Sequence, residues 1–127
     1  MIKYTYNKEI GILETIFEGE ISSENMIEYI ISIREDRELP EVLRIFSDTT
    51  NGKLKEKFGF KNLKQFLEEN KITLEKKEFV YDAYLISKPF EMALGMLYKA
   101  LNNYSNYKFD VFSSRKAAID WLKKENK

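Results

Sequence analysis

The chain has 127 residues, of which 43% are hydrophobic and 33% charged, and its 21 basic and 21 acidic side chains balance. This length and composition are typical of one soluble globular domain, and a net charge of zero removes the global electrostatic argument for nucleic-acid binding. Histidine and cysteine are absent, which excludes a Ser-His-Asp triad, a Cys-His dyad, a His-rich zinc site and a disulfide framework.

No apolar run approaches the length of a bilayer span, since even the stretch 26–33 is broken by Glu28 and Ser32. Met1 leads straight into a strand pattern, without the apolar segment and cleavage site of a secretory signal. We therefore expect a single cytoplasmic domain over residues 1–127, with no transmembrane segment, no cofactor and no metal.

The first two elements are predicted to be strands. Ile2, Tyr4 and Tyr6 alternate with polar residues, and a second alternating run extends over residues 10–21. The polar connection 7–9 between them is short, so the sequence predicts a hairpin whose two strands are antiparallel.

A helix is predicted after Ser22, because a Ser cap followed by the acidic Glu24 satisfies free backbone N–H groups and the helix dipole. Apolar side chains at helical spacing follow, and Pro40 marks the end. The next strand is predicted at 42–47. It runs into a cluster of Ser, Asp, Thr, Asn and Gly residues, which predicts a polar loop over 48–61, where ligands often bind in open α/β sheets.

The second half of the chain alternates helices and strands. The predicted elements are a helix at 62–70, a strand at 79–86, a helix from Pro89 to Leu101 capped by Ser87, a strand around 107–111 and a helix capped by Ser113 and Ser114. Phe58 and Phe60 are predicted to anchor the preceding loop to the body of the domain.

This order predicts a singly wound α/β fold with a five-stranded mixed sheet, the first strand antiparallel and the rest parallel, and four main helices. A parallel sheet covered on both faces has continuous apolar strands, whereas charges alternate along these, so we expect helices mainly on one face. The side chains expected on the half-open face are Arg44, Phe46, Asp82, Tyr84 and Asp110. They form either a dimer or partner surface, or a face on which charges meet water and pair across strands.

Two stretches resemble a known family. Residues 110–122 read Asp-Val-Phe-Ser-Ser-Arg-Lys-Ala-Ala-Ile-Asp-Trp-Leu, which is similar to the closing strand, Ser cap and Ala-x-x-Trp-Leu helix of the SpoIIAA-like group of STAS domains, also labelled STAS/SEC14. Residues 84–89 read Tyr-Leu-Ile-Ser-Lys-Pro and resemble the group's fourth strand and the start of its third helix. The resemblance spans nearly the whole chain. These are packing motifs, so they support the fold and carry no chemistry.

The resemblance also implies a candidate for phosphorylation. Regulatory STAS proteins are phosphorylated on a Ser or Thr after the third strand, in an Asp-Ser-Ser-Gly type sequence at a helix amino end. This chain reads Asp-Thr-Thr-Asn-Gly over residues 48–52, with one inserted residue, which makes Thr50, and after it Thr49, the candidate acceptor. The alternative is that Asp48 and its hydroxyl neighbours hydrogen-bond the loop backbone. Lys53 is close enough in sequence to meet a phosphate.

Three functions fit these features. The first is a non-enzymatic regulatory module that binds a protein partner, a second copy of itself or a small ligand, through the open sheet face or the loop-end residues Asp48, Lys53, Ser87 and Lys88. The second is a carrier for a lipid or other hydrophobic molecule, with Met92 and Met96 either lining a pocket or filling core gaps. The third is a hydrolase or transferase that uses Asp82 with Asp48, Ser87 and Lys88, although helix initiation alone explains Ser87-Lys88-Pro89.

Overall fold

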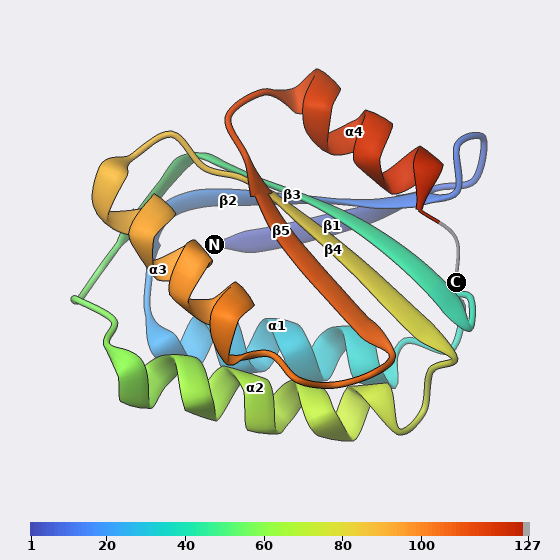
Figure 1. The fold of residues 1–127 in the computed structure, drawn as a ribbon, viewed down its shortest axis with the longest axis horizontal. Coiled ribbons are helices and arrows are strands. Elements are labelled where there is room, and N and C mark those ends of the chain that lie inside the picture. Colours follow the sequence, from blue (N-terminus) through green and yellow to red (C-terminus); the bar gives the residue numbers. More distant parts are fainter. Residues whose placement is uncertain (126–127) are drawn as a thin grey trace.

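The computed structural model describes residues 1–125 as one α/β domain (Figure 1). Its elements in chain order are β1 (Ile2–Asn7), β2 (Ile12–Ile21), α1 (Ser23–Glu35), β3 (Val42–Leu54), α2 (Phe60–Leu74), β4 (Phe79–Leu85), α3 (Pro89–Leu101), β5 (Tyr107–Phe112) and α4 (Arg115–Lys124). No helix within residues 1–125 is both long enough and apolar enough to cross a membrane.

The five strands form one sheet in the order β1-β2-β3-β4-β5. β1 is antiparallel to β2, and every other neighbouring pair is parallel. Spatial order therefore follows chain order, as in a singly wound sheet. The predicted topology is confirmed, because each β-α-β unit adds its strand next to the one before it.

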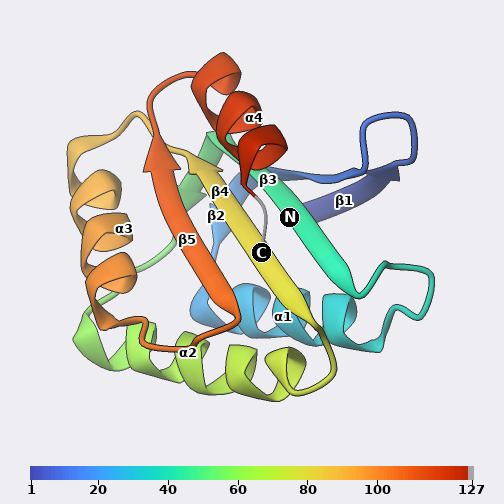
Figure 2. The ribbon, with the colours of Figure 1, turned by 45° about the vertical axis from the view of Figure 1, so that its right-hand side comes forward.

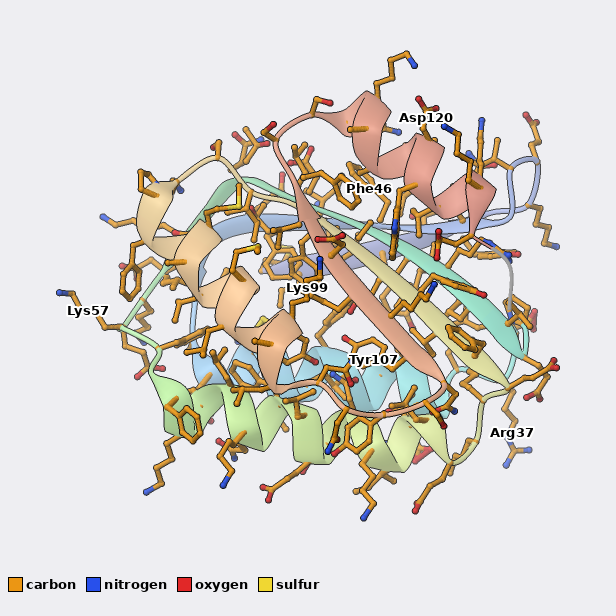
Figure 3. All side chains as sticks on the ribbon, in the orientation of Figure 1. Arg37, Phe46, Lys57, Lys99, Tyr107 and Asp120 are labelled. Carbon is orange, nitrogen blue, oxygen red and sulfur yellow. The ribbon has the colours of Figure 1, made fainter. Side chains whose placement is uncertain are left out.

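The helices cover the two faces of the sheet unequally. α1, α2 and α3 lie on one face, and α4 alone lies on the other (Figures 1 and 2). The buried side chains separate accordingly into a large cluster under α1, α2 and α3 and a smaller cluster, built around Phe46, Tyr81 and Leu122, under α4. In Figure 3, Phe46 lies beneath α4, whereas Tyr107 lies toward α2.

This arrangement corrects the predicted half-open face at two positions. Asp82 and Tyr84 point to the three-helix face, where Asp82 is 8% exposed and Tyr84 packs against the large cluster. Along β4 the residues of opposite parity, such as Tyr81, are the ones that meet α4. The charges of Asp82 and Arg44 were expected on one face and lie on opposite faces.

The predicted loop at 48–61 is also wrong over most of its length. β3 continues to Leu54, because residues 51–54 pair with the end of the long strand β2. A register shift between Ile16 and Glu18 precedes this pairing, and Gly52 fits there because an added Cβ would lie 2.9 Å from the Cβ of Phe17. Only residues 55–59 connect β3 to α2, which begins at Phe60.

The predicted helix caps are mostly confirmed. The Ser22 and Ser114 side chains accept hydrogen bonds from the backbone N–H groups of Asn25 and Ala117. The prediction for α3 is wrong by one residue, since Lys88, not Ser87, precedes Pro89 at the start of the helix and gives no side-chain cap. Phe58 is buried as expected, whereas Phe60 is 53% exposed in the first turn of α2.

Candidate functional site

A cavity of about 130 Å³ lies between the sheet and helices α1, α2 and α3. Most of its lining is aliphatic or aromatic, and four tyrosines contribute from four elements: Tyr29 (α1), Tyr84 (β4), Tyr98 (α3) and Tyr107 (β5). We call it the tyrosine cavity. Its lining side chains that reach solvent include Lys53 and Leu54 at the end of β3 and Glu91 and Leu94 in α3. Solvent therefore meets the lining between β3 and α3.

A chain of hydrogen bonds crosses the tyrosine cavity and ends on a buried carboxyl group. The Nδ2 of Asn70 in α2 donates to the hydroxyl of Tyr98 at 2.8 Å, and the hydroxyls of Tyr98 and Tyr107 lie 3.0 Å apart. Tyr107 then donates to Oδ2 of Asp82 at 2.7 Å. The chain joins α2, α3, β5 and β4, so it fixes the carboxyl group relative to two of the covering helices.

Asp82 is the unusual member of this chain. Its Oδ1 is buried and has no hydrogen-bond partner within the described part of the chain. Burial raises the pKa of Asp82 to about 7, although the hydrogen bond from Tyr107 acts in the opposite direction. A carboxyl group that titrates near neutral pH inside a cavity is a recognised marker of a functional site.

The tyrosines around Asp82 stay neutral at physiological pH. Burial is the largest cause that raises the pKa of each of Tyr29, Tyr84, Tyr98 and Tyr107, and the negative charge of Asp82 raises all four further. Their hydroxyls can therefore donate or accept hydrogen bonds but cannot act as bases. This arrangement is suited to binding and orienting a molecule.

The fold matches two solved structures over nearly its whole length. An uncharacterized protein of the DUF3478 family from Shewanella loihica PV-4, described as having a SpoIIAA-like fold, superposes with a TM-score of 0.60 at 15% identity, covering 96% of this chain and 92% of that one. The anti-sigma factor antagonist SpoIIAA in its unphosphorylated form superposes with a TM-score of 0.57 at 8% identity, covering 98% of this chain and 100% of that one. The protein has a SpoIIAA-like fold.

At these identities the likeness concerns the fold alone, and it confirms the resemblance seen in the sequence at that level. No protein-family model matches the chain, and no curated protein sequence matches it significantly. The tyrosine cavity therefore has to be interpreted from the side chains of this SpoIIAA-like domain.

On the α4 face of the SpoIIAA-like sheet, the predicted surface residues are engaged within the domain. Arg44 donates from Nε to the carbonyl of Leu122 at 3.0 Å and from Nη2 to the carbonyl of Glu125 at 2.9 Å, and its guanidinium lies 5.0 Å from the centre of the Tyr81 ring. The guanidinium of Arg115 lies 4.8 Å from the centre of the Phe46 ring, and Asp110 pairs with a lysine of α3. These side chains fasten α3 and α4 to the sheet.

The predicted loop-end residues are not gathered into one site. Thr50 is exposed in β3, and its backbone N–H donates to Oδ1 of Asp48 at 2.9 Å, so the predicted bond from Asp48 to the backbone is present, but in a strand and not in a loop. The Thr49 hydroxyl is partly buried and donates to the carbonyl of Leu85 at 2.7 Å. Ser87 and Lys88 are exposed, and the Lys88 Nζ donates to the carbonyl of Gly52.

Four of the candidate site residues predicted from the sequence do line the tyrosine cavity: Thr49, Lys53, Asp82 and Tyr84. The sequence analysis missed Tyr29, Tyr98, Tyr107 and Asn70, which complete the site. One signal was available, because β4 is apolar or aromatic on both parities except at Asp82. When both sides of a strand are buried, a single acidic side chain in it must point into one of the two cores. It needs a hydrogen-bond or charge partner there.

Proposed function

We propose that the protein is a non-enzymatic regulatory module of the STAS type, whose input is a small, mostly apolar molecule bound in the tyrosine cavity. One observation carries this proposal: an apolar cavity lies beneath three helices and contains a buried carboxyl group with an unpartnered oxygen. Interiors are normally close-packed and buried polar groups are normally paired, so both features together support a binding site.

The size of the cavity limits the ligand. A cavity of about 150 Å³ lined by Leu, Ile and Phe side chains binds benzene, whereas pockets for larger molecules occupy about 300–1,000 Å³. At about 130 Å³, the tyrosine cavity fits one ring or a short branched chain. This supports a small apolar ligand over the lipid that a carrier function requires.

Within residues 1–125, the surroundings of Asp82 support a binding role over catalysis. A hydrolase or transferase built on Asp82 requires a nucleophile or second acid–base group beside it. Asp48, Ser87 and Lys88 are not among the residues that line the cavity, and Asp82 lies in the middle of β4, not at its end. The four tyrosines whose pKa values the charge of Asp82 raises are neutral and supply no acid–base group.

A regulatory module also needs a surface to which a protein partner binds. The outer side of α3 is suited to be that surface. Its exposed apolar residues, the α3 strip, are Phe90, Ala93, Met96, Leu97 and Ala100. The opposite side of the same helix lines the tyrosine cavity through Leu94, Gly95 and Tyr98. Lys57 lies with its Nζ 6.0 Å from the centre of the Phe90 ring, so the partner that fits has an apolar surface edged by carboxylates.

The partner surface has its own test. A photo-cross-linking residue at position 93 is expected to capture one other protein in cells, and Lys57→Glu is expected to abolish that adduct. An adduct that survives Lys57→Glu, or an adduct with a second copy of this chain, contradicts the acidic partner. Light scattering on the purified protein reports the second case directly.

Ligand binding is tested with toluene as a probe of the cavity. Ile45 lines the cavity and is 5% exposed, so Ile45→Phe fills space there, whereas Ile16 is 45% exposed and Ile16→Phe serves as the matched control. We expect toluene to raise the melting temperature of the unmodified protein and of Ile16→Phe saturably, because ligands that bind only the folded state stabilise it. Binding in neither protein, or undiminished binding in Ile45→Phe, rejects the proposed function.

A further inference from the structure

The chemistry of the tyrosine cavity narrows the class of ligand. Three charged residues line it: Lys53 and Glu91, which reach solvent, and Asp82, which is buried. Lys53 and Glu91 have opposite charges that cancel. The net charge of the lining is therefore that of the buried Asp82. Its Oδ2 is occupied by Tyr107 and its Oδ1 is free of hydrogen bonds within residues 1–125.

Aromatic rings form a continuous series along the same cavity. Ring centres are 5.8 Å apart for Phe17 and Tyr84, 5.2 Å for Tyr84 and Phe109, and 4.6 Å for Phe109 and Tyr98. All four residues line the cavity. The face of an aromatic ring attracts a cation, and groups of such rings are a recurring way to bind organic ammonium ions.

A buried carboxylate and a row of rings favour the same ligand. A buried charge is costly unless it is paired, and a hydrogen bond between an ammonium and a carboxylate is stronger than one between neutral groups. A neutral alcohol donates one ordinary hydrogen bond and leaves the charge of Asp82 uncompensated. A hydrocarbon leaves Oδ1 unpartnered as well.

We propose that the tyrosine cavity binds a small protonated amine, whose ammonium donates a hydrogen bond to Asp82 and whose apolar group, about the size of one ring, lies against Phe17, Tyr84, Phe109 and Tyr98. This inference rests on the proposed function, because it requires that the cavity takes a ligand at all. It goes further in naming the chemical class of that ligand.

The amine predicts a particular pH dependence. Asp82 is faced by Tyr29 from α1, Tyr98 from α3 and Tyr107 from β5, all neutral, and by the uncharged Asn70 at the end of the hydrogen-bond chain from α2. The pKa of Asp82 is raised to about 7, so the carboxylate that binds the ammonium becomes populated as the pH rises through neutrality. Amine affinity therefore increases between pH 6 and pH 8 (a range set around that pKa), whereas the affinity for a neutral probe stays level.

The experiment compares benzylamine, benzyl alcohol and toluene, which share a ring and differ in the group that meets Asp82. Isothermal titration calorimetry is carried out on the unmodified protein, on Asp82→Asn and on Asp120→Asn, which neutralises a surface carboxylate paired with Lys116. We expect benzylamine to bind the unmodified protein and Asp120→Asn about tenfold more tightly than benzyl alcohol at the upper pH. Asp82→Asn is expected to lose that preference and to retain toluene binding.

The outcomes separate the two proposals. Toluene or benzyl alcohol binding as tightly as benzylamine overturns the amine and leaves the proposed function intact. The same conclusion follows from a benzylamine affinity that does not change with pH or in Asp82→Asn. Binding of none of the three probes overturns both. Toluene binding to Asp82→Asn also shows that this variant is folded.

Discussion

The hydroxyl of Tyr107 donates a 2.7 Å hydrogen bond to Oδ2 of Asp82, and both residues are buried on the face that three helices cover. The two side chains come from the neighbouring strands β4 and β5. Their pairing holds a carboxyl group in the middle of the domain, where burial works against its charge.

Removing the donor tests the pair directly. Tyr107→Phe leaves Oδ2 of Asp82 without a partner, so we expect the pKa of Asp82 to rise above its value of about 7, because the hydrogen bond from Tyr107 lowers it. We also expect a loss of about 1–3 kcal/mol in the free energy of unfolding when Asp82 is charged. Carboxyl-detected NMR titration and urea unfolding measure the two effects. Tyr6→Phe, in the edge strand β1, is the control and should change neither.

The stability of the protein should fall as the pH rises toward neutrality. The pKa of Asp82 is about 7 in the folded chain and 3.8 when exposed, so between these values the folded state holds a proton that the unfolded state has lost. The contribution of Asp82 to the free energy of unfolding is therefore fully present below about pH 4. It is lost as the pH rises through about 7. Between pH 5 and pH 8 the loss is about 3 kcal/mol for a shift of this size.

Urea unfolding of Asp82→Asn at the same two pH values isolates this contribution. The amide keeps the shape of the side chain and does not titrate, so the variant should lose about 3 kcal/mol less stability than the unmodified protein over that interval. Equal losses in the two proteins would show that Asp82 titrates normally. Asp110→Asn, at a carboxylate of β5 paired with Lys99 of α3, gives the background change.

The sequence predicted the sheet, its order and its helices because each depends on local patterns. Ser22 and Ser114 cap helices through bonds to residues three positions away, and alternation along β2 marks it as a strand. The face that Asp82 occupies depends on which parity of β4 meets α4, and no local pattern specifies that. Residues of both parities in β4 are apolar, so the sequence does not show which face is open to solvent. The charge of Asp82 predicts that its own side of the strand is the open face, and that prediction is wrong.

The predicted end of β3 is too early for a related reason. Residues 48–54 have the composition of a loop, yet they pair with residues 16–21 of β2, more than thirty positions earlier in the chain. Partner strands override local propensity there. The tyrosine cavity escaped for the same kind of reason, since Tyr29, Tyr98 and Tyr107 belong to three elements that only the tertiary fold brings around Asp82.

Arg44 should act as the attachment of α4. It binds two carbonyl groups at the carboxyl end of that helix, where a positive charge also complements the helix dipole. We expect Arg44→Met to lower the free energy of unfolding by about 1–3 kcal/mol and to speed hydrogen exchange of the α4 amides more than that of α1. Arg37, whose side chain points away from the domain in Figure 3, provides the control Arg37→Met. Uniform changes in exchange would contradict this role.

Only one of the two candidate threonines is open to a kinase. Thr50 is exposed, whereas the hydroxyl of Thr49 is already bonded to the carbonyl of Leu85. We therefore propose that phosphate added by a cell lysate with ATP is found on Thr50, is lost in Thr50→Val and persists in Thr49→Val, as read by intact and fragment mass. Phosphate found on Thr49 would contradict this assignment. If neither the unmodified protein nor Thr49→Val gains a phosphate, this segment is not a phosphorylated switch.

Gly52 should be indispensable for the join between β2 and β3. An alanine Cβ there would lie 2.9 Å from the Cβ of Phe17 and 3.4 Å from its carbonyl oxygen, and neither atom can move without moving the strand. We expect Gly52→Ala to cost about 1–3 kcal/mol in urea unfolding, as overpacking does elsewhere. Gly59 is the matched control, because nothing lies within 4 Å of a Cβ added there and its φ of −126° suits any residue. A Gly52→Ala variant as stable as Gly59→Ala would show that the register shift tolerates a side chain.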